Sequence, residues 1–265
     1  MTRAATLVVL AALALLAGCA KPPSGPTDTP PAPRPANEPA DPERRAAVRM
    51  ELAALYFQRG QHETALGEIR QALAAKPDLI DAYSLRGLVM AAMGDARGAE
   101  ESFQRALQLG PTDGGTMHNY GWFLCQNNRH PEAEAQFLKA MAQPQYRDGV
   151  RTLLAMGVCQ ARSGRWAEAE RTLSRSYELD PANPVTAINL SEVLLRRGEL
   201  ERARFYVRRI NTQPGQMSSQ SLWLAARIER RLGNLEGLRD LGNQLRERFP
   251  QSPETLRFER GQFDE

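Results

Sequence analysis

The stretch IDAYSLRGLVMAAMGDARGAEESFQRALQLGP, residues 80–111, decides how the rest of the chain is organised. Apolar residues recur three and four positions apart on both sides of Gly94, which predicts two amphipathic helices joined by a tight turn. Gly87 and Ala99 are small enough to let the helices approach closely, and Pro111 ends the second helix. Such a hairpin cannot bury its apolar face alone, so it needs a copy of itself on either side.

Copies of this hairpin are found along the chain. The small residue of the first helix recurs in steps of 34, 34, 36, 34 and 35 residues, at Ala53, Gly87, Gly121, Gly157, Ser191 and Ala226. The turn residues become Gly60, Gly94, Asn128, Gly164, Gly198 and Gly233. The small residue of the second helix recurs at Ala65, Ala99, Ala133, Ala169 and Ala203, with Leu238 as an exception. Prolines that end the hairpins fall at Pro77, Pro111, Pro144, Pro181, Pro214 and Pro250.

A period of about 34 residues with two helices per unit resembles the tetratricopeptide repeat. The resemblance implies an all-α fold, a right-handed superhelical solenoid of six repeats. We expect the repeats at about 46–79, 80–113, 114–149, 150–183, 184–217 and 219–250. A short capping helix over residues 252–260 follows, with Ser252 as N-cap and Pro253 in its first turn.

The chain begins with the pattern of a secretory signal peptide. Arg3 precedes an apolar run, residues 4–17, that is too short to span a membrane, and the run ends in LAGC at 16–19. This ending resembles the lipobox of bacterial lipoproteins, which implies cleavage before Cys19 and its acylation, with palmitate as a typical chain. The alternative is an ordinary signal peptide with an incidental cysteine. Because Ala20 is not the aspartate that retains enteric lipoproteins in the inner membrane, the resemblance implies the periplasmic face of the outer membrane.

Three segments are therefore expected: a signal peptide at 1–18, a lipidated cysteine and tether at 19–42, and a repeat domain at 43–265. Half of the 18 prolines lie between residues 20 and 42, where little is apolar, so this segment is predicted to be an extended, disordered tether. A proline-rich ligand for a partner domain is the alternative.

Composition excludes some functions and leaves others open. A net charge of +3 without clustered positive charge gives no case for nucleic-acid binding. His62 lies in the first repeat, and His118 and His130 lie in different helices of the third; none has a second histidine three or four residues away, so we expect no helical zinc site, metal or cofactor. Phosphate-loop and nucleophile-elbow motifs are absent from the sequence, and we expect no enzyme.

Two cysteines remain once Cys19 is assigned to the lipid. Cys125 and Cys159 lie on the first helices of the third and fourth repeats, which are predicted to pack side by side. They are either joined in a disulfide, as favoured in an oxidising compartment, or buried as two small apolar residues.

Function is therefore expected at the surface, in a groove lined by the first helices, which suits a bound helix or extended peptide. The predicted protein-binding residues are Met50, Phe57, Leu88, His118, Asn119, Trp122, Gln126, Leu154, Val158 and Arg162. The groove is expected to continue along Ile188, Asn189, Glu192, Arg196, Trp223, Arg227 and Arg231, so that its N-terminal end is apolar and its C-terminal end carries arginines. The alternative for Met50, Leu88 and Trp122 is burial between neighbouring helices.

The third repeat carries a more specific resemblance. Its sequence HNYGWFLCQN, residues 118–127, resembles the N-Y-G-W-F-L-C-Q signature of the type IV pilus biogenesis and stability lipoproteins, the pilotins of the PilF and PilW type. That resemblance implies a monomeric outer-membrane lipoprotein that binds the pilus secretin subunit and promotes its localisation and multimerisation. The alternative is a repeat scaffold in outer-membrane protein assembly or cell-wall synthesis.

Overall fold

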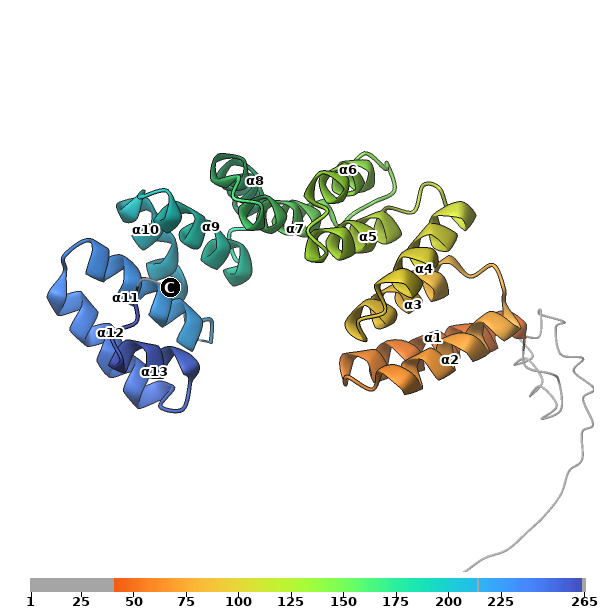
Figure 1. Ribbon diagram of the computed structural model, residues 1–265, viewed down its shortest axis with the longest axis horizontal. Helices are drawn as coiled ribbons and strands as arrows, with labels where there is room; N and C mark the ends of the chain where they lie inside the picture. Colours follow the sequence, from red (N-terminus) through yellow and green to blue (C-terminus); the bar gives the residue numbers. More distant parts are fainter. Residues whose placement is uncertain (1–40, 214, 264–265) are drawn as a thin grey trace, which may run out of the picture. The chain divides into compact units, whose positions relative to one another are not determined.

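The computed structural model describes residues 41–213 and 215–263, which form one compact helical unit. The predicted signal peptide, Cys19 and nearly all of the tether lie outside the described residues. Within these ranges the structure contains thirteen α-helices and no strand (Figure 1). No helix in the described part is both long and apolar enough to cross a bilayer.

Twelve of the helices form six successive antiparallel hairpins, which confirms the predicted solenoid. Their bounds are α1 Pro42–Gln58, α2 His62–Ala75, α3 Ile80–Ala92, α4 Ala96–Leu109, α5 Gly114–Gln126, α6 His130–Met141, α7 Gly149–Arg162, α8 Trp166–Leu179, α9 Pro184–Arg196, α10 Leu200–Asn211, α11 Ser219–Arg231 and α12 Leu235–Arg248. Each hairpin packs against the next, and first helices of successive repeats also touch, as α5 does with α3 and α7.

Helix α1 begins at Pro42, before the predicted start near Ala46, and takes in the last residue assigned to the tether. The side chain of Asp41 accepts a hydrogen bond from the backbone N–H of Glu43, and Pro42 occupies the first helical turn. Proline is favoured there because its missing N–H has no helical partner. The proline that suggested a tether is thus a helix-start signal.

The predicted turn residues adopt the backbone that the hairpins need. Every one has a positive φ, from 61° at Asn128 to 83° at Gly94. Glycine reaches this left-handed region without steric cost, and asparagine tolerates it better than most residues.

The seam within the second and third hairpins is filled by residues of complementary size. A Cβ atom at Gly87 would lie 2.7 Å from the ring of Phe103, and one at Gly121 would lie 2.8 Å from the ring of Phe137. Both rings are fully buried. The small first-helix residue therefore makes room for a large second-helix residue sixteen positions later.

A short helix closes the C-terminal end of the unit. Helix α13, Pro253–Glu259, begins at the predicted N-cap Ser252, whose side chain accepts a hydrogen bond from the N–H of Thr255. It places the ring of Phe258 against Gly242 of α12, where a side chain would collide with it. Phe263 then packs on Trp223 of α11, with ring centroids 4.9 Å apart.

Candidate functional site: an apolar groove on the first helices

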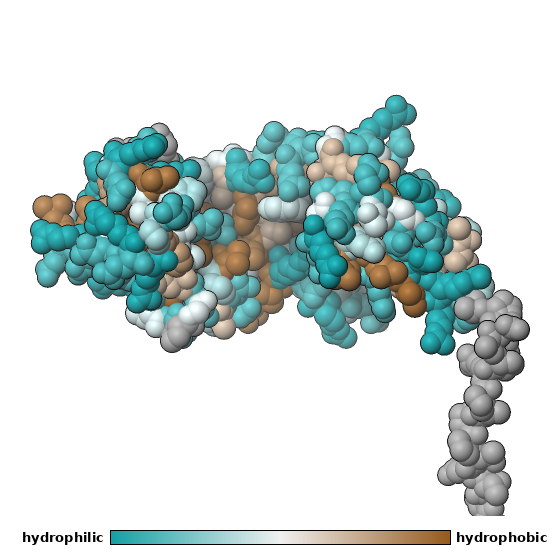
Figure 2. Space-filling view, turned by 90° about the horizontal axis from the view of Figure 1, so that it is seen from below, coloured by the Kyte–Doolittle hydropathy of each residue, from teal (hydrophilic) through white to brown (hydrophobic). Residues whose placement is uncertain are grey.

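A groove of about 350 Å³ lies across the first helices of the third, fourth and fifth repeats, α5, α7 and α9. Its lining residues are His118, Trp122, Arg151, Leu154, Ala155, Val158, Val185 and Asn189. Figure 2 shows apolar residues gathered in the middle of the face seen from below, between more hydrophilic ends. Val185 is 52% exposed, so its aliphatic side chain is open to contact in the groove.

The structure brings together only part of the predicted groove. His118, Trp122, Leu154 and Val158 line it together with Asn189. In contrast, Met50 and Phe57 pack on the buried cluster of the first repeats, and Leu88 packs on the cluster that includes Phe103.

The other predicted groove residues also have different surroundings. The side-chain amide of Asn119 donates a hydrogen bond to Ser84 on α3 at 3.2 Å. Gln126 and Arg162 are exposed at the ends of α5 and α7 and do not line the groove. This groove therefore lies across the third, fourth and fifth repeats.

The arginines expected at the C-terminal end are engaged with the fold. Arg227 pairs with Glu192 of α9 at 2.8 Å, and Arg231 donates a hydrogen bond to the backbone carbonyl of Leu195 at 3.0 Å. These contacts join the fifth and sixth repeats and hold both guanidinium groups in place.

Sequence reasoning missed three lining residues, Arg151, Ala155 and Val185. The prediction took the positions five to three residues before the small residue of each first helix. Arg151 and Val185 lie six residues before Gly157 and Ser191, and Ala155 lies two before Gly157, so all three fell outside it. The helical spacing of 151, 154, 155 and 158 on α7 would have found two of them, since residues three, four and seven apart share one face.

His118 forms the buried polar end of the groove. Its Nδ1 lies 2.8 Å from the hydroxyl of Thr152, which also lies 2.7 Å from the hydroxyl of Tyr146. Burial lowers the pKa of His118 to about 4, with the charge of Arg151 acting in the same direction and Asp148 opposing it. The imidazole is therefore neutral at pH 7 and presents no charge to a ligand.

Several known proteins are similar to this chain in sequence and fold. Tetratricopeptide-repeat families match residues 53–94, 84–149, 124–184 and 160–228. The crystal structure of PilW, described as a widely conserved type IV pilus biogenesis factor, is 30% identical and superimposes with a TM-score of 0.74. The match covers 80% of this chain and 96% of that one. The chain belongs to the PilW family of tetratricopeptide-repeat proteins.

Two further matches involve a protein of Pseudomonas aeruginosa. The type IV pilus assembly protein PilF is 27% identical over 219 residues, which cover 83% of this chain and 86% of PilF. A solved structure of P. aeruginosa PilF covers 83% of this chain and 99% of that one at 24% identity and a TM-score of 0.70, and supports the fold.

The PilW-family signature in the third repeat has mainly a structural role. The hydroxyl of Tyr120 donates to Glu100 of α4 at 2.6 Å, and Arg129 donates to both oxygens of the same carboxylate at 2.8 Å. Hydrogen bonding from Tyr120 is the main cause of the lowered pKa of Glu100, and burial with this bond raises the pKa of Tyr120 to about 12. Of the signature residues between 119 and 126, only Trp122 lines the groove.

Cys125 and Cys159 are joined in a disulfide between α5 and α7, with Cα atoms 5.8 Å apart. Nδ1 of His130, the first residue of α6, lies 3.5 Å from Sγ of Cys159. Sequence reasoning missed this contact because it considered histidine pairs within one helix, whereas these residues come from two repeats.

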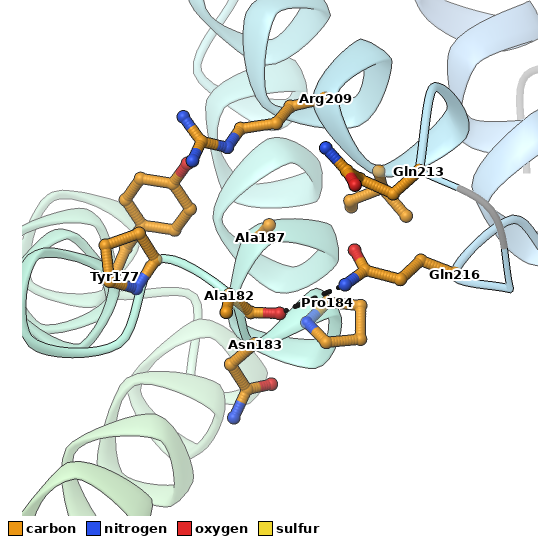
Figure 3. Close-up of a pocket in the computed structure, with 10 residues that line it drawn as sticks. Tyr177, Ala182, Asn183, Pro184, Ala187, Arg209, Gln213 and Gln216 are labelled. Carbon is orange, nitrogen blue, oxygen red and sulfur yellow. Dashed lines mark hydrogen bonds between the residues drawn. The ribbon is translucent and has the colours of Figure 1, made fainter.

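A smaller hollow of about 170 Å³ lies between the fourth and fifth repeats and was not predicted (Figure 3). Tyr177 of α8, Pro184 of α9 and Arg209 of α10 are among its lining residues. Gln216 closes one side by donating to the backbone carbonyl of Ala182 at 3.4 Å. Its planar polar side chains offer hydrogen bonds, but its volume is half that of the central groove.

Proposed function

We propose that this protein acts in type IV pilus biogenesis as a lipid-anchored pilotin, which binds the secretin subunit and promotes its multimerisation in the outer membrane. The observation that carries the proposal is the match to PilW over 96% of that chain, together with an apolar groove in the same solenoid. The relationship to PilW supports a role in type IV pilus biogenesis, and the groove offers a surface on which a client protein could bind.

The groove has the chemistry of a peptide-binding surface. Trp122, Leu154, Val158 and Val185 provide apolar contacts, and Asn189 provides a polar group at the side. A short amphipathic segment of a client would bury its apolar side chains there. Covering such surface protects an unassembled membrane protein from aggregation, because exposed apolar patches associate non-specifically.

The sequence before residue 41 supplies the proposed anchor. An acylated Cys19 would hold the protein at the membrane, since each buried methylene contributes about 0.8 kcal/mol. The proline-rich segment would set how far the repeat domain reaches from the membrane. Tethering would raise the local concentration of this protein near a client in the same membrane.

The test is secretin assembly in a strain that lacks this protein. SDS-resistant secretin multimers are measured in separated inner and outer membranes after complementation with wild type, Cys19→Ala or groove variants. We expect multimers to be lost without the protein, and Cys19→Ala to leave them absent or in the inner membrane. Normal outer-membrane multimers in the deletion strain would refute the proposal and favour a scaffold in outer-membrane protein assembly or cell-wall synthesis.

A matched pair of substitutions tests whether the groove is responsible. Val185 in the groove and Leu138 on α6 are 52% and 53% exposed, so aspartate at either position costs the fold little. We expect Val185→Asp to reduce multimers at unchanged protein abundance and Leu138→Asp to behave as wild type. Equal assembly by both variants would exclude this groove as the client site.

A further inference from the structure

The disulfide that joins the third and fourth repeats has a third potential metal ligand beside it. Among the described residues, ligand atoms of Cys125, His130 and Cys159 all lie within 4.8 Å of one another. Both cysteines are buried, and His130 is half-buried at the start of α6. Two sulfurs and an imidazole nitrogen are a common donor set for Zn²⁺.

We propose that the reduced protein binds one Zn²⁺ through Cys125, Cys159 and Nδ1 of His130, and that the disulfide is the metal-free, oxidised state of the same site. The two states are mutually exclusive, because a sulfur in a disulfide has no thiolate to give to a metal. This site is independent of the apolar groove and of secretin binding.

The distances fit zinc with little movement. With Zn–S near 2.3 Å and Zn–N near 2.0–2.1 Å, two such ligands at a tetrahedral angle lie about 3.6 Å apart. The observed separation of Cys159 Sγ and His130 Nδ1 is 3.5 Å. Two thiolates on one zinc lie about 3.8 Å apart by the same geometry. Rotation of the cysteine side chains can provide that separation between helices whose Cα atoms are 5.8 Å apart.

His130 also gives the site a route to solvent. It lines a hollow of about 540 Å³ together with Pro131, Glu134 and Leu138. Glu134 is held by Arg165 at 2.7 Å and by Gln160 at 2.9 Å, so its carboxylate is already partnered. Water from the hollow can supply the fourth zinc ligand, as in three-residue zinc sites.

The change of state requires a dithiol reductant in one direction and a disulfide oxidant in the other. A dithiol reductant gives two electrons and two protons to the Cys125–Cys159 disulfide and is itself oxidised to a disulfide. Zn²⁺ then replaces the two thiol protons, which pass to solvent, and no electron is transferred in this step. Oxidation of the two thiolates by a disulfide donor would release the metal.

The experiment measures zinc bound by the purified full chain after reduction, in a Cys19→Ala background that leaves only Cys125 and Cys159 as thiols. Zinc is titrated against a chromophoric chelator, and Co²⁺ serves as a spectroscopic probe of thiolate ligation. We expect one Zn²⁺ per reduced chain, none in the oxidised chain, and thiolate-to-cobalt absorption in the reduced chain only. Circular dichroism checks that reduction leaves the helices intact.

The deciding variant is His130→Ala, because it keeps both cysteines. We expect its zinc affinity to fall at least tenfold, as removal of one of three protein ligands requires. His62→Ala is the matched control. His62 begins α2 as His130 begins α6, but the positions equivalent to Cys125 and Cys159 in its surroundings are not cysteines, so this variant should bind zinc like wild type. Zinc binding by His130→Ala at wild-type affinity, or no zinc binding by the folded, reduced wild type, would overturn the proposal.

Discussion

The imidazole of His118 lies between the hydroxyl of Thr152 and the ring of Phe137, whose centroid is 5.8 Å away. Only 5% of the residue is exposed. Burial disfavours the charged form, and for this reason the pKa falls below its ordinary value. A residue that lines the central groove thus couples stability to pH.

The first prediction concerns this coupling. Because the pKa of His118 falls from 6.5 to about 4 on folding, the unfolded chain binds a proton between these values that the folded chain does not. The contribution of His118 to the free energy of unfolding is therefore present above pH 6.5 and is lost as the pH falls toward 4. Lowering the pH from 7 to 5 should cost about 2 kcal/mol through this group.

Urea unfolding of wild type and His118→Gln at pH 7 and pH 5 measures the effect. Glutamine can still hydrogen-bond to Thr152 but does not titrate. We expect the loss of stability between the two pH values to be about 2 kcal/mol smaller in the variant. The same pH sensitivity in both proteins would contradict the assignment to His118.

At the scale of elements, a recurring ion pair joins neighbouring hairpins. The glutamate that follows the small residue of a second helix pairs with an arginine of the next repeat: Glu100 with Arg129 at 2.8 Å, Glu134 with Arg165 at 2.7 Å, and Glu170 with Arg202 at 2.7 Å. At the next junction the charges are reversed, and Arg204 pairs with Glu229 at 2.8 Å. These contacts fix how one repeat sits on the next.

The second prediction separates such a pair from an ordinary surface pair. The side chain of Glu100 is 27% exposed and accepts hydrogen bonds from Tyr120 and Arg129, whereas that of its neighbour Glu101 is 60% exposed and pairs with Arg97 on the same helix. We expect Glu100→Gln to cost about 1–2 kcal/mol and Glu101→Gln less than about 0.5 kcal/mol. Urea unfolding at pH 7 compares them, and equal costs would mean that the junction contact contributes nothing.

The turns of the hairpins could be predicted from the sequence, whereas contacts between repeats could not. Gly94 and Asn128 were identified as turns because positive φ is a property of the residue itself. The packing of Met50 on the core of the first repeat could not be derived from its position alone, because the side of a helix that faces a neighbour depends on packing between repeats. The proximity of His130 to Cys159 was missed for the same reason, since it joins residues 29 positions apart.

At the scale of the whole molecule, a stack of repeats has two ends whose apolar surfaces need cover. The C-terminal end is covered by α13 through Phe258 and Phe263, whose ring centroids are 5.5 Å apart. Arg246 of α12 lies over the ring of Phe258 at 5.5 Å. In a repeat protein each unit depends mainly on its neighbours, so loss of this cover should act locally.

The third prediction follows from that local dependence. Phe258→Ala should lower stability by about 2 kcal/mol, less than full burial would imply because the ring is half-buried. Hydrogen exchange should accelerate in α11 and α12 and stay unchanged in α1 to α4. Phe205→Ala is the control, because Phe205 is 59% exposed and its loss should change stability by less than about 0.5 kcal/mol. Uniform acceleration along the chain would contradict a local cap.

The disulfide between α5 and α7 also determines how the molecule responds to a pulling force. A chain stretched by its two ends unravels hairpin by hairpin, and every hairpin that opens lengthens it. The 34 residues from Cys125 to Cys159 cannot contribute, which removes about 110 Å from the extensible length. Trp122 and Leu154 lie on the two helices that the disulfide joins, so they would stay close to each other after the outer repeats have unfolded under force.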